Sequence, residues 1–170
     1  MFCKRLNILI LLSLIVPVYA AAGDAGVQAA PNGLELPEGY KDWPVISISH
    51  RIDNHTLRVI FGNDIAIKAA RAGQTNPWPD GAILGKVVWK ETAKENWPKA
   101  IAPKEFVHAE FMFKDTKAYK TNGTGWQWAR WVGMEQKPFG KNAEFSKVCI
   151  SCHTPVKSSD WVFTTPAQLP

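Results

Sequence analysis

The sequence predicts an α+β fold that is mainly an antiparallel β-sheet with a few helices. Apolar residues recur with period two in four separate segments, which is the pattern of half-buried strands. One internal segment, in contrast, has the start and stop signals of a helix. The chain has 170 residues, and the part that follows residue 20 suits a single domain.

The N-terminus has the features of a secretory signal peptide. Lys4 and Arg5 precede an apolar stretch, and Val18-Tyr19-Ala20 offers a cleavage site with small residues. The apolar stretch is shorter than the roughly 20 residues that span a bilayer. We therefore expect residues 1–20 to be cleaved and the protein to be periplasmic, with an uncleaved anchor as the alternative.

Cleavage would change the cysteine count and the charge of the protein. It would remove Cys3 and leave Cys149 and Cys152 as the two cysteines. The formal net charge would fall from +5 to +3, because Lys4 and Arg5 would be lost. There is no block of like charges typical of nucleic-acid binding, so we expect no nucleic-acid partner.

The residues after the signal peptide divide into a leader and one domain. Residues 21–35 are small, rich in Gly and Ala, and without periodicity, which predicts a flexible leader. The domain is expected to span residues 36–170, beginning with a turn or short helix around Pro37 and Gly39.

Four segments of the domain alternate as strands do. They are HTLRVIFGND (55–64), GAILGKVVWKE (81–91), FVHAEFMFKD (106–115) and GWQWARWVG (125–133). The alternation assigns one face of its strand to each of Arg58, Lys86 and Glu110, so the three side chains could converge on one pocket. The alternative is that each is a solvated residue on an outer sheet face.

The segments between the strands have other signals. NDIAIKAARAG (63–73) predicts a helix with Asn63 or Asp64 as its cap and Gly73 after its end. NPWPDG (76–81) predicts a turn, and KENWPKAIAPKE (94–105) predicts a loop between strands. AEFSKVCISCH (143–153) predicts a short helix near the C-terminus.

That last helix carries the pattern Cys-x-x-Cys-His, formed by Cys149, Cys152 and His153. Two thiols at this spacing can add across the vinyl groups of a haem, and the adjacent histidine can then bind the iron. The alternatives are a redox dithiol, half a zinc site and a plain disulfide. The adjacent histidine, together with export, favours one covalently attached haem c with His153 as the metal ligand.

No methionine follows His153, so a sixth iron ligand would have to come from upstream, or there is none. His108, two residues before Glu110, is one such candidate ligand. The alternative for His108 is a surface or hydrogen-bonded histidine.

From Leu36 to Thr165 the chain resembles the cytochrome P460 family and the related β-sheet cytochromes c-prime. The residues that carry the resemblance include LPEGYKDW, WPDGAILGKVVWKE, HAEFMFKD, GWQWARW and VCISCHTPVKSSDWVFT. The haem motif alone is common to many families, whereas the combination of these segments in this order is much more specific.

The resemblance implies a homodimer with a five-coordinate haem that is open to small nitrogen compounds or diatomic gases. In the family members that oxidise hydroxylamine, a lysine is joined to the haem edge, and that position corresponds to Lys86. The resemblance further implies that Arg58 is a distal arginine and that Glu110 is a proton-relay residue.

The function expected from these observations is that of an exported mono-haem c-type cytochrome that oxidises hydroxylamine or a related small nitrogen compound. Electrons would leave to a periplasmic acceptor. The alternatives are a gas-binding cytochrome that sequesters nitric oxide and an electron carrier. A gas trap favours apolar side chains over the iron, and Phe111 lies next to Glu110, so a shift of one residue in register would reverse the expectation.

Overall fold

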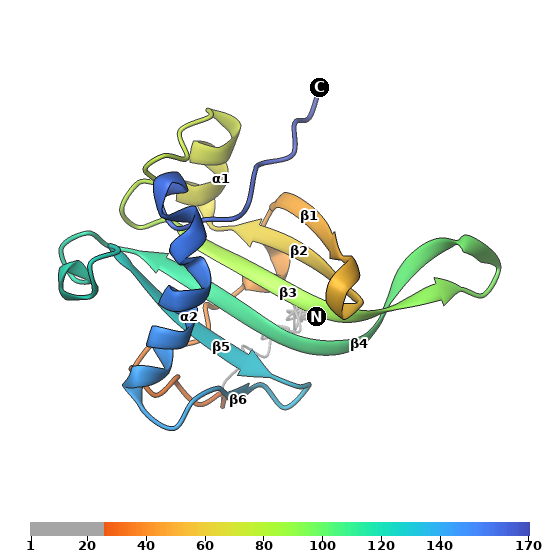
Figure 1. Ribbon diagram of the computed structural model, residues 1–170, viewed down its shortest axis with the longest axis horizontal. Coiled ribbons are helices and arrows are strands. Elements are labelled where there is room, and N and C mark those ends of the chain that lie inside the picture. The colour runs from red at the N-terminus through yellow and green to blue at the C-terminus, as the bar shows by residue number, and fades with distance from the viewer. Residues whose placement is uncertain (1–25) are drawn as a thin grey trace, which may run out of the picture.

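A computed structural model describes residues 26–170 of the chain. The expected signal peptide and the first residues of the expected leader lie outside that range. One six-stranded sheet dominates the fold, in which each strand pairs antiparallel with the next along the chain (Figure 1). The strands are β1 Val45–Arg51, β2 Thr56–Gly62, β3 Ile83–Lys94, β4 Trp97–Lys114, β5 Trp126–Val132 and β6 Lys137–Pro138. The predicted fold class is confirmed.

Short helices complete this part of the chain. They are the α-helices α1 Asp64–Arg71 and α2 Ser146–His153, and the 3-10 helices η1 Tyr40–Asp42, η2 Ile52–Asn54, η3 Lys120–Asn122, η4 Ala143–Phe145 and η5 Thr154–Ser159. Within residues 26–170, none of the helices is long and apolar enough to cross a membrane.

Helix α1 begins and ends where the sequence predicted. The side-chain oxygen of Asn63 accepts a hydrogen bond from the backbone N–H of Ala66 at 3.0 Å, which satisfies one of the amides at the helix start. Gly73 follows the helix with φ 69°, a conformation that costs glycine little. The helix buries Ala66 and Ile67 in a core that also contains Trp128 of β5.

The register of the sheet places four residues from four strands in one row. Ile60 lies opposite Lys86, Lys86 lies opposite Glu110, and Glu110 lies opposite Arg130. Residues that pair across a sheet point to the same side, so these four side chains share one face. We call it the α2 face, because α2 crosses the sheet on this side (Figure 1).

The opposite face is covered by the N-terminal segment. Phe111 and Trp131 point to this side and are fully buried, with Tyr40 packed edge-on against Phe111 at a centroid distance of 5.2 Å. Phe113 packs in the same cluster. Phe111 and Phe113, the two phenylalanines that follow Glu110 in the sequence, therefore lie on the far side of the sheet from α2.

The leader from Gly26 onwards differs from the prediction, because it packs against the sheet instead of being free. Ala30 is 3% exposed, and the indole N–H of Trp131 donates to the carbonyl of Gln28 at 2.9 Å. The side chain of Asn32 donates to the carbonyl of Trp128 at 2.9 Å. Small residues without periodicity gave no sign of this packing, since it depends on tryptophans about a hundred residues further along the chain.

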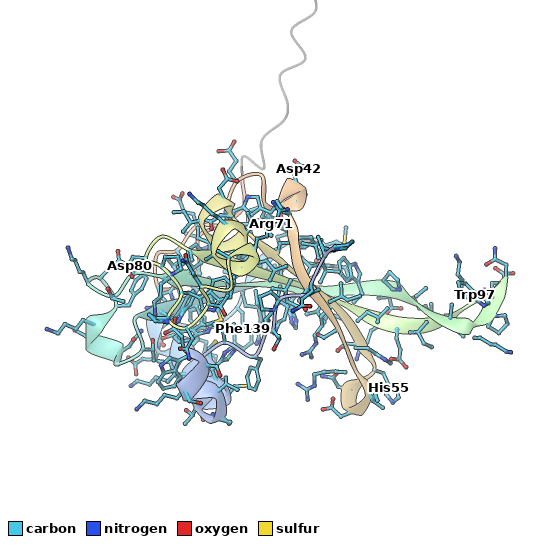
Figure 2. All side chains as sticks on the ribbon, turned by 90° about the horizontal axis from the view of Figure 1, so that it is seen from above. Asp42, His55, Arg71, Asp80, Trp97 and Phe139 are labelled. Carbon is cyan, nitrogen blue, oxygen red and sulfur yellow. The ribbon has the colours of Figure 1, made fainter. Side chains whose placement is uncertain are left out.

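Residues 94–105, predicted to be a loop, instead form part of a long hairpin. Strand β3 continues to Lys94 and β4 starts at Trp97, and Figure 2 shows Trp97 at the far end of this projecting arm. Pro98 and Pro103 lie within β4, and they cannot donate to a strand ladder. The pairing in the arm is correspondingly irregular, which explains why alternation was not visible in the sequence. Strand β1 and the two-residue strand β6 were not predicted either.

Candidate haem site

Helix α2 presents the Cys-x-x-Cys-His motif on the side of the sheet that carries the row of charged residues. Cys149 and Cys152 lie one helical turn apart, so their side chains project from neighbouring positions on the helix surface. Cys149 is half-buried against the core, whereas Cys152 is exposed, and both thiols are free. Burial raises the pKa of the Cys149 thiol. The short helix predicted near the C-terminus is confirmed: α2 spans Ser146–His153, with His153 as its last residue.

The imidazole of His153 is held in one orientation by the backbone. Its Nδ1 lies 2.6 Å from the carbonyl oxygen of Trp161, and since a carbonyl only accepts, Nδ1 carries the proton. This leaves Nε2 as the nitrogen with a lone pair for a metal. Burial lowers the pKa of His153, and the hydrogen bond to Trp161 offsets only part of that effect. The neutral form, which is the one that binds metals, is therefore favoured.

Aromatic rings flank this imidazole. The ring centroid of Trp128 lies 5.8 Å from that of His153, and the ring of Phe163 lies 5.1 Å away, close to edge-on. Such a setting excludes water from one side of a ligand histidine and leaves little freedom for the ring to turn.

Glu110 is the centre of a cluster of charges on the α2 face. Its carboxylate lies 2.5 Å from Nζ of Lys86, 2.5 Å from a terminal guanidinium nitrogen of Arg130 and 3.1 Å from Nε2 of His108. The Glu110 side chain is 18% exposed. Three strands thus supply one carboxylate and three basic partners. Because these side chains contact one another, Lys86 and Glu110 are not the separate, solvated surface residues of the alternative interpretation.

The electrostatics of this cluster keep Glu110 ionised. Burial alone would raise the pKa of Glu110, but the hydrogen bond from His108 and the positive charges of Lys86 and Arg130 outweigh it. The pKa of Glu110 is therefore well below the usual range. Glu110 is therefore a carboxylate at neutral pH and accepts hydrogen bonds from its neighbours.

Arg58 lies on the same face but outside this cluster. It pairs with Val88 across the strands, and its Nε donates to the hydroxyl of Thr56 at 3.3 Å. Burial is the main reason why the pKa of Arg58 is lowered, while the charge of Glu110 acts in the opposite sense. The structure thus brings Lys86 and Glu110 into contact and leaves Arg58 one row further along the sheet.

The motif on α2 and the charged cluster are close enough to influence each other. Arg130, Glu110 and Lys86 all act electrostatically on Cys149, and Lys86 and Glu110 also act on His153. The residues predicted from the sequence to form one site therefore do gather on one side of the sheet.

Two buried donors on β5 have no hydrogen-bond partner within the described residues. They are Nε1 of Trp128 and Nε of Arg130. Buried polar groups are nearly always paired, so two orphaned donors beside the motif mark a place where a further group with acceptor atoms fits. A haem supplies both a large apolar ring for the aromatic wall and carboxylates for the donors, so the residues present fit this cofactor.

Several site residues were missed by sequence reasoning. Arg130 was not singled out, although the alternation of GWQWARWVG (125–133) puts it on the same face as Trp126 and Trp128 and could have placed it beside Glu110. His108 was left open between iron ligand and hydrogen-bonded residue, and the structure has it bonded to Glu110. The carbonyl of Trp161 gave no signal, because backbone atoms leave no trace in residue type.

An antiparallel sheet with a cluster of partly buried charges on one face, crossed on that side by a helix with a Cys-x-x-Cys-His motif, defines a class of small sheet cytochromes. The family model for cytochrome P460 matches residues 37–164. The chain therefore belongs to the cytochrome P460 family and is a c-type haem protein, as the resemblance had indicated. The match includes all the residues of the site described above. Among curated proteins, none matches the chain.

Proposed function

We propose that this chain is an exported mono-haem c-type cytochrome that oxidises hydroxylamine or a related small nitrogen compound. The observation that carries the proposal is the ionised, partly buried carboxylate of Glu110, which lies on the α2 face in contact with Lys86, His108 and Arg130. A trap for an uncharged gas favours apolar side chains over the iron, whereas this side of the sheet carries a charged cluster, in which three basic partners offset the cost of partly burying the carboxylate.

The cofactor would be held by three residues of α2. The thiols of Cys149 and Cys152 would form thioether bonds by adding across two vinyl groups, and Nε2 of His153 would bind the iron. When bound, the haem supplies an iron site that takes the small nitrogen ligand and accepts its electrons.

The chain's own part in the reaction is to move protons and to orient the substrate. Oxidation of hydroxylamine removes protons from N–H and O–H bonds, and Glu110 is the carboxylate positioned to accept them. Because its pKa is low, Glu110 would hold a proton only briefly, and His108, whose Nε2–H donates to the carboxylate at 3.1 Å, would keep that carboxylate oriented. Arg58, one row along the same face, would bind the substrate oxygen.

Lys86 is proposed to bond covalently to the haem edge. A lysine amine is a nucleophile only without its extra proton, so Lys86, whose Nζ lies 2.5 Å from the Glu110 carboxylate, would have to lose that proton before the bond forms. Replacing an N–H and a C–H bond by an N–C bond releases two protons and two electrons. The reaction therefore needs a two-electron oxidant of the peroxide class during maturation.

Turnover is the direct test of this function. Purified holoprotein, incubated with hydroxylamine and an artificial one-electron acceptor, should reduce the acceptor at a rate proportional to enzyme concentration. The absence of turnover, together with tight binding of nitric oxide, would favour the gas-binding alternative instead. Rapid reduction by other redox proteins without hydroxylamine turnover would favour an electron carrier.

The remaining expectations on partners also belong to this proposal. Electrons would pass to a periplasmic acceptor, and two copies of the chain would form a homodimer. Export is tested by fractionation of a host that carries the full sequence, with the haem protein expected in the periplasm and its N-terminus near residue 21. Light scattering coupled to gel filtration gives the mass of the assembly.

A further inference from the structure

Lys114 and Asp160 form a buried ion pair outside the Glu110 cluster. Asp160 directly precedes Trp161, whose carbonyl contacts the histidine of the motif. Nζ of Lys114, at the end of β4, lies 2.7 and 2.9 Å from the two carboxylate oxygens of Asp160. The side chains of Lys114 and Asp160 are only 3% and 10% exposed. One oxygen of Asp160 also accepts a hydrogen bond from the backbone N–H of Trp78 at 2.8 Å.

Burying two charges costs desolvation energy, so a pair of this kind is weak evidence for stability and better evidence for a specified geometry. Lys114 is further enclosed by the ring of Trp126, whose centroid lies 4.9 Å from Nζ. The indole N–H of Trp126 donates to the carbonyl of Asp160 at 2.8 Å. Asp160 is thus fixed through both its side chain and its backbone.

The backbone at this point has an uncommon conformation. Asp160 and Trp161 have φ values of 51° and 65°, and two successive non-glycine residues in the left-handed region persist only where the surroundings hold them. The N–H of Trp161 donates to the carbonyl of Val156 at 3.0 Å, which closes the turn after η5.

This turn places the carbonyl of Trp161 at the imidazole of His153. The carbonyl oxygen lies 2.6 Å from Nδ1, so it fixes both the proton on Nδ1 and the rotation of the ring. A continuous set of contacts therefore runs from Lys114 through Asp160 to Trp161 and ends at His153. Partners of this kind orient a metal-binding histidine and raise its basicity.

We propose that the Lys114–Asp160 ion pair is a positioning element for His153, which sets the strength of the bond between the imidazole and the iron. Neither residue touches the cofactor, and both act through the carbonyl of Trp161. The inference rests on the proposed role of His153 as the iron ligand.

The test uses resonance Raman spectra of the ferrous holoprotein, in which the iron–imidazole stretching band reports the strength of that bond. Asp160→Asn keeps an acceptor for the Trp78 amide and tolerates the left-handed backbone, but it removes the ion pair. We expect the band to move to lower frequency and the reduction potential to become more positive, because Nδ1 loses a well-placed acceptor. Haem staining on a denaturing gel should be unchanged.

Asp80→Asn is the matched control. Asp80 accepts hydrogen bonds from the backbone and hydroxyl of Thr116 at 2.9 and 2.7 Å, and it interacts with Lys114 only through charge, so its replacement leaves the hydrogen bonds between Lys114 and Asp160 in place. Its band should stay at the wild-type frequency. If Asp160→Asn does not fold, Lys114→Gln carries the same test, since it removes the pair and leaves the bond between Asp160 and Trp78 in place.

The possible outcomes separate this inference from the proposed function. If the iron–imidazole band of Asp160→Asn or Lys114→Gln has the same frequency as in the wild type, the positioning role alone is overturned. A wild-type protein without any iron–imidazole band would overturn the ligand role of His153, and the inference with it. A shift in Asp160→Asn that the Asp80→Asn control reproduces would also refute the proposal, because the effect would then not be specific to this turn.

Discussion

Replacing Glu110 by glutamine removes the charge at the centre of the site and keeps the shape of the side chain. The carboxylate contacts Lys86, His108 and Arg130, and a hydrogen bond to a charged group contributes roughly 1.5–3 kcal/mol. Water offsets part of this loss, since the Lys86 and Arg130 side chains are 30% and 29% exposed. We therefore expect the free energy of unfolding of Glu110→Gln to fall by about 2 kcal/mol at pH 7.

The dependence on pH follows from the lowered pKa of Glu110. A carboxyl group whose pKa is lower in the folded than in the unfolded protein stabilises the fold above its unfolded pKa, which is about 4.3 for glutamate. That contribution is lost as the pH falls towards the folded pKa. The stability difference between wild type and Glu110→Gln should therefore shrink below about pH 4.

Activity should change more than stability does. Loss of a proton-transfer group lowers kcat by typically 10²-fold or more, so we expect about a 100-fold slower oxidation of hydroxylamine with unchanged haem content. Glu105→Gln, an exposed position on the same strand, is the matched control and should retain wild-type stability and kcat. Denaturant unfolding and steady-state kinetics measure the two effects. Wild-type kcat in Glu110→Gln would refute the role of Glu110 in proton transfer.

Three further predictions concern the cofactor. Haem should stay on the wild-type band in a denaturing gel and be lost from a Cys149→Ser/Cys152→Ser variant, whereas loss from the wild type in a host with a working maturation system would refute covalent attachment. The ferrous protein should bind carbon monoxide with a large spectral change if, as we propose, the sixth position is open; a low-spin spectrum that His108→Ala converts to high spin would contradict this. Lys86→Ala should lose hydroxylamine oxidation while keeping its thioether-linked haem, and Lys90→Ala, on the same strand face, should not.

The strand faces could be predicted from the sequence because alternation in a strand has a fixed period of two. Arg58, Lys86 and Glu110 were assigned to their faces without any knowledge of how the strands pair. The pairing confirms those assignments and adds the register, which aligns Lys86 with Glu110 and Glu110 with Arg130. Local periodicity predicts the side of the sheet to which a residue points, but not which residue lies opposite it on the next strand. For that reason the contact between Arg130 and Glu110 was missed.

The features that sequence reasoning missed depend on contacts between distant parts of the chain. Lys114 and Asp160 are 46 positions apart, and neither shows a local pattern that predicts a buried pair. The packing of residues 26–35 and the long arm likewise depend on tertiary contacts that override local composition. The site motif, in contrast, is local, since Cys149, Cys152 and His153 lie within a single helix.

The central claim is that this cytochrome P460 family member carries a lysine-linked haem for the oxidation of hydroxylamine. Mass spectrometry of a tryptic digest of the purified holoprotein tests it most directly. The account predicts one haem joined both to the peptide with Cys149 and Cys152 and to the peptide with Lys86, and a red-shifted absorption band in the intact protein. A haem held by two thioether bonds alone, with an ordinary c-type spectrum, would contradict the claim and leave gas binding as the better account.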